Sequence, residues 1–271
     1  MIGGVVLDVD GTVVRGGEPI PGAPAAVDRL RAAGLPVVFC SNNPTAGPAA
    51  YVDRLGGAGI EVDGEAVVTA ATATAAYLRA NHAGASAYVF GEDSVEDRLR
   101  ETTELRLLSE PGPASVVVAT IDYDFGYDDM RLAIQTVDDD TAFVGTDPDP
   151  VIPASEGRVP GSGAVVNALA GVIGREPDAV PGKPSATAAR LVRERLGVQG
   201  EDLLVVGDRL STDVALGERL GAETALVGTG VTDIDGDGGG VTPAADGDPE
   251  PDHVCASLAT VVDRVLDREQ T

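Results

Sequence analysis

Residues 2–12 read Ile-Gly-Gly-Val-Val-Leu-Asp-Val-Asp-Gly-Thr, and this stretch decides the fold. An apolar run that ends in acidic residues is typical of a buried parallel strand, because helices cover both faces of such a strand. Side chains two positions apart on an extended chain point the same way, so Asp8 and Asp10 share a side, and Gly11 frees the backbone to turn. The sequence therefore predicts a strand whose carboxyl end carries two acids.

Segments typical of strands and of helices alternate along the rest of the chain. Further strands are expected at residues 35–40, 66–69, 87–90, 115–120, 141–144, 203–206 and 224–227. Helices are expected at residues 24–33, 48–55, 70–80, 95–101, 127–137, 163–174, 185–196, 211–220 and 258–266. Ser211 is the expected N-cap of its helix, and Cys255 is expected at the start of the last one. This alternation predicts an α/β protein with a parallel sheet covered by helices.

Length and composition favour a soluble protein of one to two domains. The chain has 271 residues, of which 43% are hydrophobic, which is enough for a sizeable core. No apolar run approaches the ~18 residues of a membrane span, and the N-terminus lacks the basic region of a signal peptide. The two cysteines, Cys40 and Cys255, make no disulfide framework. We therefore expect a cytoplasmic protein.

The charge balance is strongly acidic, with 19 Lys and Arg against 44 Asp and Glu and a net charge of −25. This balance argues against nucleic acid and against an anionic membrane surface as partners. It is typical of a surface adapted to high salt. The Asp- and Gly-rich segment 232–252 matches half of a calcium loop, but Ala244 stands where a bidentate carboxylate is needed, so we expect a flexible acidic loop.

The polar residues gather where the expected strands end, which is where open α/β sheets bind their ligands. They are Asp8 and Asp10, the run Ser41-Asn42-Asn43, the run Gly182-Lys183-Pro184-Ser185, and Asp208 with Asp213. Lys183 is the only lysine among the 19 basic residues of the chain. Since Arg and Lys differ in shape and hydration, a chain that otherwise avoids lysine indicates a specific need for it at this position.

These residue types suit phosphate chemistry. Neighbouring carboxylates repel one another, and Asp8, Asp10 and Asp208 offer the oxygen ligands that Mg²⁺ prefers. Ser41 supplies a hydroxyl donor, and the amides around Asn42 and Asn43 suit an anion. Lys183 supplies a compact positive charge for a transferring phosphoryl group. One carboxylate can then act as nucleophile and a second as general acid and base.

The four clusters resemble, in order, the four motifs of the haloacid dehalogenase (HAD) superfamily. The residues of these motifs fit the branch of NagD-type and p-nitrophenyl-phosphatase-like enzymes. They are Asp-Val-Asp-Gly-Thr-Val at 8–13, Ser-Asn-Asn-Pro at 41–44, Gly-Lys-Pro-Ser at 182–185, and Gly-Asp at 207–208 with Thr212-Asp213. The resemblance covers nearly the whole chain. It implies a Rossmann-like parallel-sheet core that uses Mg²⁺.

The resemblance also implies a role for each residue. Asp8 is expected to be the nucleophile and a Mg²⁺ ligand, while Asp10 acts as general acid and base and binds the metal through its carbonyl. Ser41, Asn42 and Asn43 are expected to hold the phosphoryl group together with Lys183, which also bridges to the nucleophile. Asp208 is expected to be a metal ligand. Thr12 and Asp213 are expected to support the site.

An inserted α/β cap domain is the further implication, since about 140 residues separate the second and third motifs. We expect a discontinuous core at 1–80 and 178–271 and a cap at 81–177. Residues expected to face the substrate are Asp122, Asp124, Phe125, Tyr127, Asp147, Asp149 and Gly161–Gly163. Asp147 departs from the family's sequence pattern, which has Asn at the position before Pro148. This change is compatible with salt adaptation or with discrimination against an anionic leaving group.

The sequence thus predicts a Mg²⁺-dependent phosphatase that hydrolyses a small phosphomonoester, such as a sugar phosphate, a nucleoside monophosphate or phosphoglycolate, through an aspartyl-phosphate. A phosphotransferase or mutase with the same intermediate stays open, as does a phospho-binding protein that does not hydrolyse. A receiver-like switch would be about half as long and would lack Asp10. A P-loop kinase is excluded because its Gly-rich lysine motif is missing. A homodimer is compatible with the resemblance.

Overall fold

The structure is a computed structural model that describes residues 2–110, 112–154, 157–198, 200–232, 234–235, 240–241 and 247–269. Within the acidic segment 232–252, Asp233, Asp237 and Gly238 of the half calcium pattern, together with Ala244, lie outside these residues. The chain divides into two compact units. Unit 1 comprises Met1–Ser41, Pro48–Val68 and Lys183–Thr271, and unit 2 comprises Asn42–Gly47 and Thr69–Gly182.

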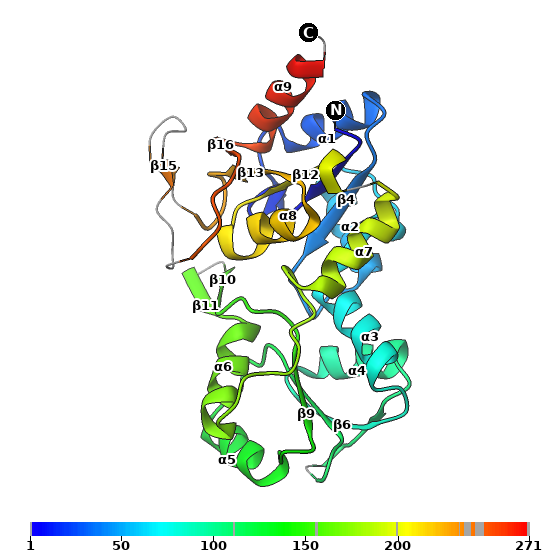
Figure 1. The fold of residues 1–271 in the computed structure, drawn as a ribbon, viewed down its shortest axis with the longest axis vertical. Helices are drawn as coiled ribbons and strands as arrows, with labels where there is room; N and C mark the ends of the chain where they lie inside the picture. Colours follow the sequence, from blue (N-terminus) through cyan, green and yellow to red (C-terminus); the bar gives the residue numbers. More distant parts are fainter. Residues whose placement is uncertain are drawn as a thin grey trace. The chain divides into compact units, whose positions relative to one another are not determined.

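Unit 1 is built on a six-stranded sheet in the order β16-β13-β12-β1-β4-β5 (Figure 1). Its strands are β1 (Gly4–Leu7), β4 (Val37–Ser41), β5 (Val67–Thr69), β12 (Leu203–Gly207), β13 (Glu223–Val227) and β16 (His253–Cys255). The central strand β1 pairs in parallel with β12 on one side and with β4 on the other. All four residues of β1 are buried, as expected for a strand covered on both faces. The carboxyl ends of β1 and β12 therefore lie side by side.

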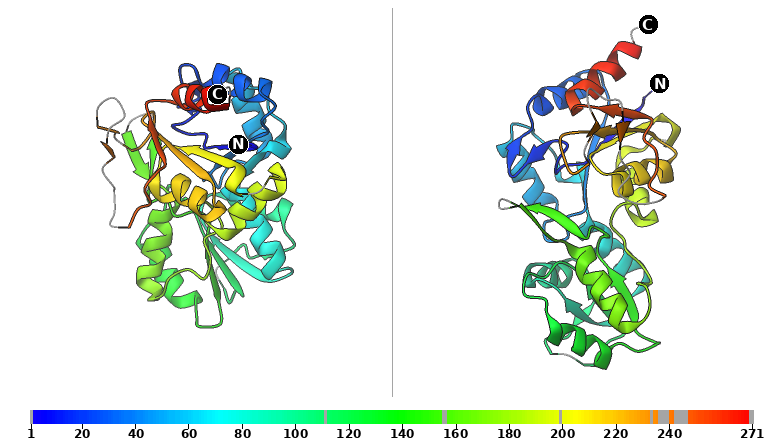
Figure 2. Two further views of the ribbon diagram at one scale, coloured as in Figure 1. Left: turned by 45° about the horizontal axis from the view of Figure 1, so that its top comes forward. Right: turned by 90° about the vertical axis from the view of Figure 1, so that its left-hand side faces the viewer.

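Helices cover both faces of this sheet (Figure 2). They are α1 (Ala23–Ala32), α2 (Pro48–Gly57), α7 (Ala186–Leu196), α8 (Ala215–Leu220) and α9 (Leu258–Glu269). On one face, Val192 of α7 and Leu216 of α8 pack against Val6, Val38 and Val205 of the sheet. Helices α1 and α9 contact each other on the opposite face. The apolar spacing read from the sequence accounts for these helices, because each one places its apolar stripe on the sheet.

Unit 2 has its own parallel sheet in the order β7-β6-β8-β9. Its strands are β6 (Ser86–Phe90), β7 (Arg106–Leu107), β8 (Val116–Ala119) and β9 (Ala142–Gly145), and its helices are α3 (Ala70–Asn81), α4 (Asp93–Thr102), α5 (Tyr127–Thr136) and α6 (Ser162–Ile173). Strand β8 is buried on both faces: Val117 faces the cluster of α5 and α6, and Val118 faces the cluster of α3 and α4. This unit is a second α/β layer structure.

The remaining strands form short pairs that were not predicted from the sequence. They are β2 (Val14–Arg15) with β3 (Glu18–Pro19), β10 (Val151–Ala154) with β11 (Gly157–Pro160), and β14 (Ile234–Asp235) with β15 (Gly240–Val241), all antiparallel. Single turns of 3₁₀-helix lie at Gly64–Ala66 and Gly200–Asp202. None of the helices in the described residues is both long enough and apolar enough to cross a membrane.

Two local expectations were wrong. Ser211 does not cap a helix: it lies inside a π-helical turn, Leu210–Val214, whose N-cap is Arg209. Among the residues that the structure describes, no side-chain hydrogen bond caps this turn. The Asp213 carboxylate on the turn instead accepts from the backbone amides of Asp208 and Arg209, which precede it. Cys255 does not begin the last helix either; it ends β16, where it is buried.

Candidate active site

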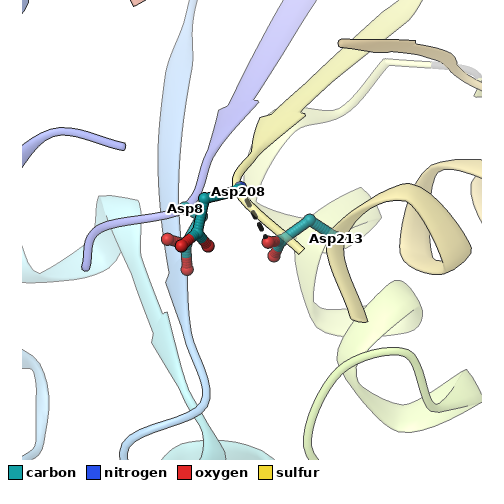
Figure 3. A group of neighbouring side chains, drawn as sticks. All are labelled: Asp8, Asp208 and Asp213. Carbon is teal, nitrogen blue, oxygen red and sulfur yellow. Dashed lines mark hydrogen bonds between the residues drawn. The ribbon is translucent and has the colours of Figure 1, made fainter. Parts of the chain in front are cut away.

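Three buried carboxylates meet at the carboxyl edge of the sheet in unit 1 (Figure 3). Asp8 follows β1, Asp208 follows β12, and Asp213 lies on the π-helical turn. One oxygen of each lies within 4.8 Å of the others, and all three residues are less than one tenth exposed. Parallel pairing of β1 with β12 brings together two acids that are 200 positions apart in the sequence.

Lys183 closes this cluster from a different part of the chain. Its Nζ donates to Oδ1 of Asp8 at 2.6 Å, to Oδ1 of Asp213 at 2.6 Å and to the carbonyl of Cys40 at 2.8 Å. The lysine is 3% exposed, so its three donors are directed by the protein. Burial disfavours the ammonium, but Asp213 and Asp8 together raise the pKa of Lys183 well above its ordinary value. Lys183 is therefore held as a buried cation.

One lysine does not neutralise three buried acids. Burial, together with the charges of Asp213 and Asp208, raises the pKa of Asp8 well above its ordinary value, against the opposing effect of Lys183. Burial and the Asp213 charge raise the pKa of Asp208 to about 7. The cluster therefore favours an additional positive charge, which a divalent cation supplies.

The oxygens that remain for such a cation belong to Asp8 and Asp208. Asp213 uses Oδ1 for Lys183 and Oδ2 for the amides of Asp208 and Arg209. Oδ2 of Asp208 accepts from the amide of Val231 at 2.6 Å, while Oδ2 of Asp8 has only a long contact of 3.4 Å with the Thr12 hydroxyl. The buried carboxylate oxygens of Asp8 and Asp208 are a donor set that fits Mg²⁺.

Glycines hold the backbone close to Asp208. Gly11 has φ of +93°, and a Cβ there would overlap Oδ2 of Asp208 and lie 2.9 Å from Cα of Gly230. A Cβ on Gly230 would also overlap the Asp208 carboxylate. The Thr229 hydroxyl donates to the carbonyl of Gly11 at 2.6 Å, which ties the two loops together. Only glycine allows this close approach.

Asp10 does not join the carboxylate cluster through its side chain. Its two carboxylate oxygens instead accept from the guanidinium of Arg54, with Nη1 at 3.1 Å from Oδ2 and a shorter contact from Nη2 to Oδ1. Ser41, at the end of β4, is buried, and its hydroxyl lies 2.7 Å from the hydroxyl of Tyr51. Tyr51 and Arg54 both belong to α2 and were not singled out in the sequence. Their three-residue spacing on a helix directly after the Ser41 loop was the available signal.

The other two residues of the predicted phosphate loop belong to unit 2. Asn42 Nδ2 donates to Oδ2 of Asp149 at 3.1 Å, and Asn43 Oδ1 accepts from the amide and hydroxyl of Thr45. Asp149 follows Asp147, whose carboxylate accepts from the Thr146 hydroxyl and from the Asp149 amide. Asp147 is 2% exposed, and burial together with the Asp149 charge raises its pKa to about 7.

The remaining unit 2 candidates differ in exposure. Tyr127 is 78% exposed at the start of α5, Asp124 is exposed, and Asp122 is partly buried. Phe125 packs partly against the cluster of α5 and α6. Gly161–Gly163 begin α6, where a Cβ on Gly161 or Gly163 would overlap the carbonyl oxygen of Asp149 or Pro148. These glycines thus serve close backbone packing within unit 2.

Comparison with known proteins assigns the chain to a family. Residues 5–103 match the family model described as haloacid dehalogenase-like hydrolase, and residues 180–261 match the HAD-hydrolase-like model. The chain is 32% identical over 227 residues to the sugar-phosphatase AraL of Bacillus subtilis, covering 84% of this chain and 83% of that protein. This chain belongs to the haloacid dehalogenase superfamily.

Solved structures place it in the branch expected from its motifs. The p-nitrophenyl phosphatase from Archaeoglobus fulgidus superposes with a TM-score of 0.82 at 31% identity, covering 97% of this chain and 99% of that one. A glycerol phosphate phosphatase from Mycobacterium tuberculosis, solved in complex with calcium, superposes with a TM-score of 0.78 at 25% identity, covering 96% and 74%. This HAD protein is a phosphoric monoester hydrolase of the NagD and p-nitrophenyl phosphatase branch, with the predicted parallel-sheet core.

Proposed function

We propose that this HAD hydrolase removes phosphate from a small phosphomonoester, with a sugar phosphate as the first substrate class to test. The single observation that carries the proposal is Asp8, whose buried carboxylate is held by Lys183 Nζ at 2.6 Å beside Asp208. The names of the relatives support the substrate class, since they act on a sugar phosphate, p-nitrophenyl phosphate or glycerol phosphate.

The first half of the reaction is phosphoryl transfer to the enzyme. A carboxylate oxygen of Asp8 attacks phosphorus and forms an aspartyl-phosphate, while the bond to the ester oxygen breaks. Asp10 donates its proton to the leaving alkoxide. Lys183, Ser41 and the amides that follow Ser41 bind the phosphoryl oxygens as charge builds up on them.

Hydrolysis of the aspartyl-phosphate completes the cycle. Water attacks phosphorus, Asp10 takes the water proton, and the bond to the Asp8 oxygen breaks to release inorganic phosphate. Asp8 and Asp208 would hold Mg²⁺, with the Asp10 carbonyl as a third ligand, and Asp213 would keep Lys183 and the Asp208 loop in place. When bound, Mg²⁺ supplies positive charge that offsets the negative charge of the carboxylates and the phosphate.

Unit 2 is proposed to be the inserted domain that reads the leaving group. It contains its own sheet and core, so it can change its loops without disturbing the strands that carry Asp8 and Asp208. Variation of such a domain suits a superfamily in which one chemistry serves many substrates. A cytoplasmic, high-salt setting is proposed from the net charge of −25.

Phosphate release from a panel of phosphomonoesters tests the function. The panel contains sugar phosphates, nucleoside monophosphates, phosphoglycolate, glycerol phosphate and p-nitrophenyl phosphate, each with Mg²⁺ or with EDTA in molar KCl. We expect release that needs Mg²⁺ and that is lost in Asp8→Asn, whereas Asp263→Asn, an exposed acid in the same unit, retains it. A folded wild type that releases no phosphate from any ester would contradict the proposal.

A further inference from the structure

Helix α2 places two side chains, one turn apart, against two residues that the proposed function uses. The hydroxyl of Tyr51 lies 2.7 Å from the hydroxyl of Ser41. The guanidinium of Arg54 reaches both carboxylate oxygens of Asp10. The same guanidinium carbon lies 5.7 Å from the centre of the Tyr51 ring, so the two side chains also contact each other. The four residues form a connected chain within unit 1.

Burial shows that Tyr51 acts as a neutral hydroxyl. The residue is 1% exposed, and burial together with the negative charge of Asp10 raises the pKa of its hydroxyl to about 12. Either hydroxyl can donate in this pair, so the buried Tyr51 hydroxyl restricts the orientation of the Ser41 hydroxyl. Tyr51 thereby fixes the position from which the Ser41 hydroxyl meets a phosphoryl oxygen in the proposed function.

The guanidinium of Arg54 contacts both oxygens of the Asp10 carboxylate, which is partly exposed to solvent. The side chain of Asp10 is 37% exposed and that of Arg54 is 28% exposed. A pair this exposed contributes little to fold stability. Its geometric effect is larger, because a guanidinium fork fixes the plane of the carboxyl group that it binds. Proton transfer depends on that placement.

We propose that α2 is a positioning element of this active site, in which Tyr51 orients the Ser41 hydroxyl and Arg54 orients the Asp10 carboxyl. The proposal rests on the proposed function for the roles of Ser41 and Asp10. It adds two residues that do not themselves touch the reacting atoms. It also explains why one helix contributes both contacts: a single rigid element sets the phosphate donor and the proton donor relative to each other.

The role of Arg54 can be tested by comparing two substrates that differ in their leaving group. A p-nitrophenolate leaves from phosphorus without a proton, whereas an alkoxide needs one, so only the alkyl ester depends on Asp10 in the first step. We expect Arg54→Met to lower kcat/KM for an alkyl phosphate by about 10-fold or more and for p-nitrophenyl phosphate by about 3-fold or less. Arg54→Lys keeps the charge without the fork and is expected between these values. Arg29→Met removes another surface ion pair of unit 1 and should leave the ratio unchanged.

The double variant with Asp10→Asn separates positioning from a general structural effect. Asp10→Asn alone should show the same preference for the aryl ester, and Arg54→Met should add little in that background. An equal loss on both esters, an additive loss in the double variant, or a gain on the alkyl ester would overturn the role of Arg54. These outcomes differ from failure of the proposed function, in which the wild type would hydrolyse neither ester.

The role of Tyr51 is tested by the binding of inorganic phosphate as a product inhibitor. Tyr51→Phe keeps the ring that lies beneath the Arg54 guanidinium but removes the hydroxyl. We expect the inhibition constant of phosphate to rise about 5-fold, and no further rise when Tyr51→Phe is added to Ser41→Ala. Tyr88→Phe, which removes a hydroxyl in unit 2 beside Phe90, is the matched control. An unchanged inhibition constant in Tyr51→Phe, or full additivity with Ser41→Ala, would overturn this role.

Discussion

Lys183 and Asp8 are 175 positions apart, yet Nζ of the lysine lies 2.6 Å from Oδ1 of the aspartate in a site where both are buried. A buried ion pair is stable only when its remaining donors and acceptors are also satisfied. Lys183 meets this condition through Asp213 and the carbonyl of Cys40. The only lysine of the chain therefore orders three segments of the core at once.

Replacement of Lys183 is the first prediction. Lys183→Met leaves Asp8 and Asp213 buried without their cation, so we expect the free energy of unfolding at pH 7 to fall by about 3 kcal/mol and kcat to fall about 100-fold or more. Urea unfolding and phosphate release measure the two effects. The stability loss should shrink as the pH is lowered, because the carboxylates then take up protons. Lys183→Arg should not restore activity, since the wider guanidinium does not fit between the two acids.

Arg29→Met is the control for this experiment, because Arg29 and Asp263 form an exposed ion pair in the same unit. Such pairs contribute about 0–1 kcal/mol. A Lys183→Met variant as stable and as active as Arg29→Met would show that the buried lysine is dispensable.

Magnesium should stabilise the folded protein through Asp208. A ligand that binds only the folded state adds about 2.7 kcal/mol at 100 times its Kd, so the Tm should rise with Mg²⁺ and return to its starting value with EDTA. Asp208→Asn should abolish this shift. Asp263→Asn, at an exposed site, should retain the shift of the wild type. An identical Mg²⁺ shift in Asp208→Asn would remove Asp208 from the metal site.

Alanine substitutions of two glycines can distinguish the effect of backbone strain from the effect of contact with the site. Gly11 and Gly17 share a φ of +93°, but only a Cβ on Gly11 would overlap Asp208; around Gly17 nothing lies within 4 Å. We expect each Ala substitution to cost about 1–2 kcal/mol for the positive φ. Gly11→Ala should in addition lose the Mg²⁺-induced rise in Tm and the phosphatase activity, which Gly17→Ala keeps. Equal behaviour of the two variants would show that the approach of Gly11 to Asp208 has no functional consequence.

Local sequence patterns were sufficient for most of the core. The apolar run before Asp8 and the alternation of strands and helices predicted the parallel sheet, because periodicity reflects which faces are buried. The short hairpin of Val14–Arg15 and Glu18–Pro19 was missed, since strands of two residues carry no periodic signal. Its Gly-Gly turn at residues 16–17 was the available clue.

The contacts that could not be predicted from the sequence are those that depend on the three-dimensional path of the chain. The strand-end acids and the only lysine were found because each is unusual in its own position. The partners of Asp10 and Ser41 on α2 were not found, because helix residues after a loop do not show which side chains they reach. The bonds from the amides of Asp208 and Arg209 to the Asp213 carboxylate were likewise not found, because only the folded backbone brings these groups together.

Salt should stabilise this protein. The net charge of −25 makes like charges repel in the folded state, and that repulsion is screened over about 10 Å at 0.1 M salt and about 3 Å at 1 M. We expect the Tm to rise between low and molar KCl. A variant with Asp139→Asn and Asp140→Asn, two neighbouring exposed acids, should melt slightly higher than wild type at low salt and equally at molar salt. A Tm that is the same in low and molar KCl would contradict this expectation.

Asp147 should make stability fall as the pH rises, and replacing it with Asn should remove this dependence. Burial and Asp149 raise its pKa from 3.8 to about 7, so between these values the folded protein keeps a proton that the unfolded chain has lost. Stability from this group therefore falls as the pH rises through that window, by about 1.4 kcal/mol per pH unit at most, and is constant below and above it. The Thr146 and Ser162 side chains, which hydrogen-bond to Asp147, oppose part of the shift.

Asp147→Asn has no proton to lose, while its amide keeps the size of the side chain. The variant should therefore gain stability relative to wild type as the pH is raised from about 5 to about 8, in urea unfolding at several pH values. Asp128→Asn, an exposed acid of the same unit paired with Arg131, should follow the wild type throughout. A difference between Asp147→Asn and wild type that stays constant with pH would mean that Asp147 is ionised in the folded protein across this range.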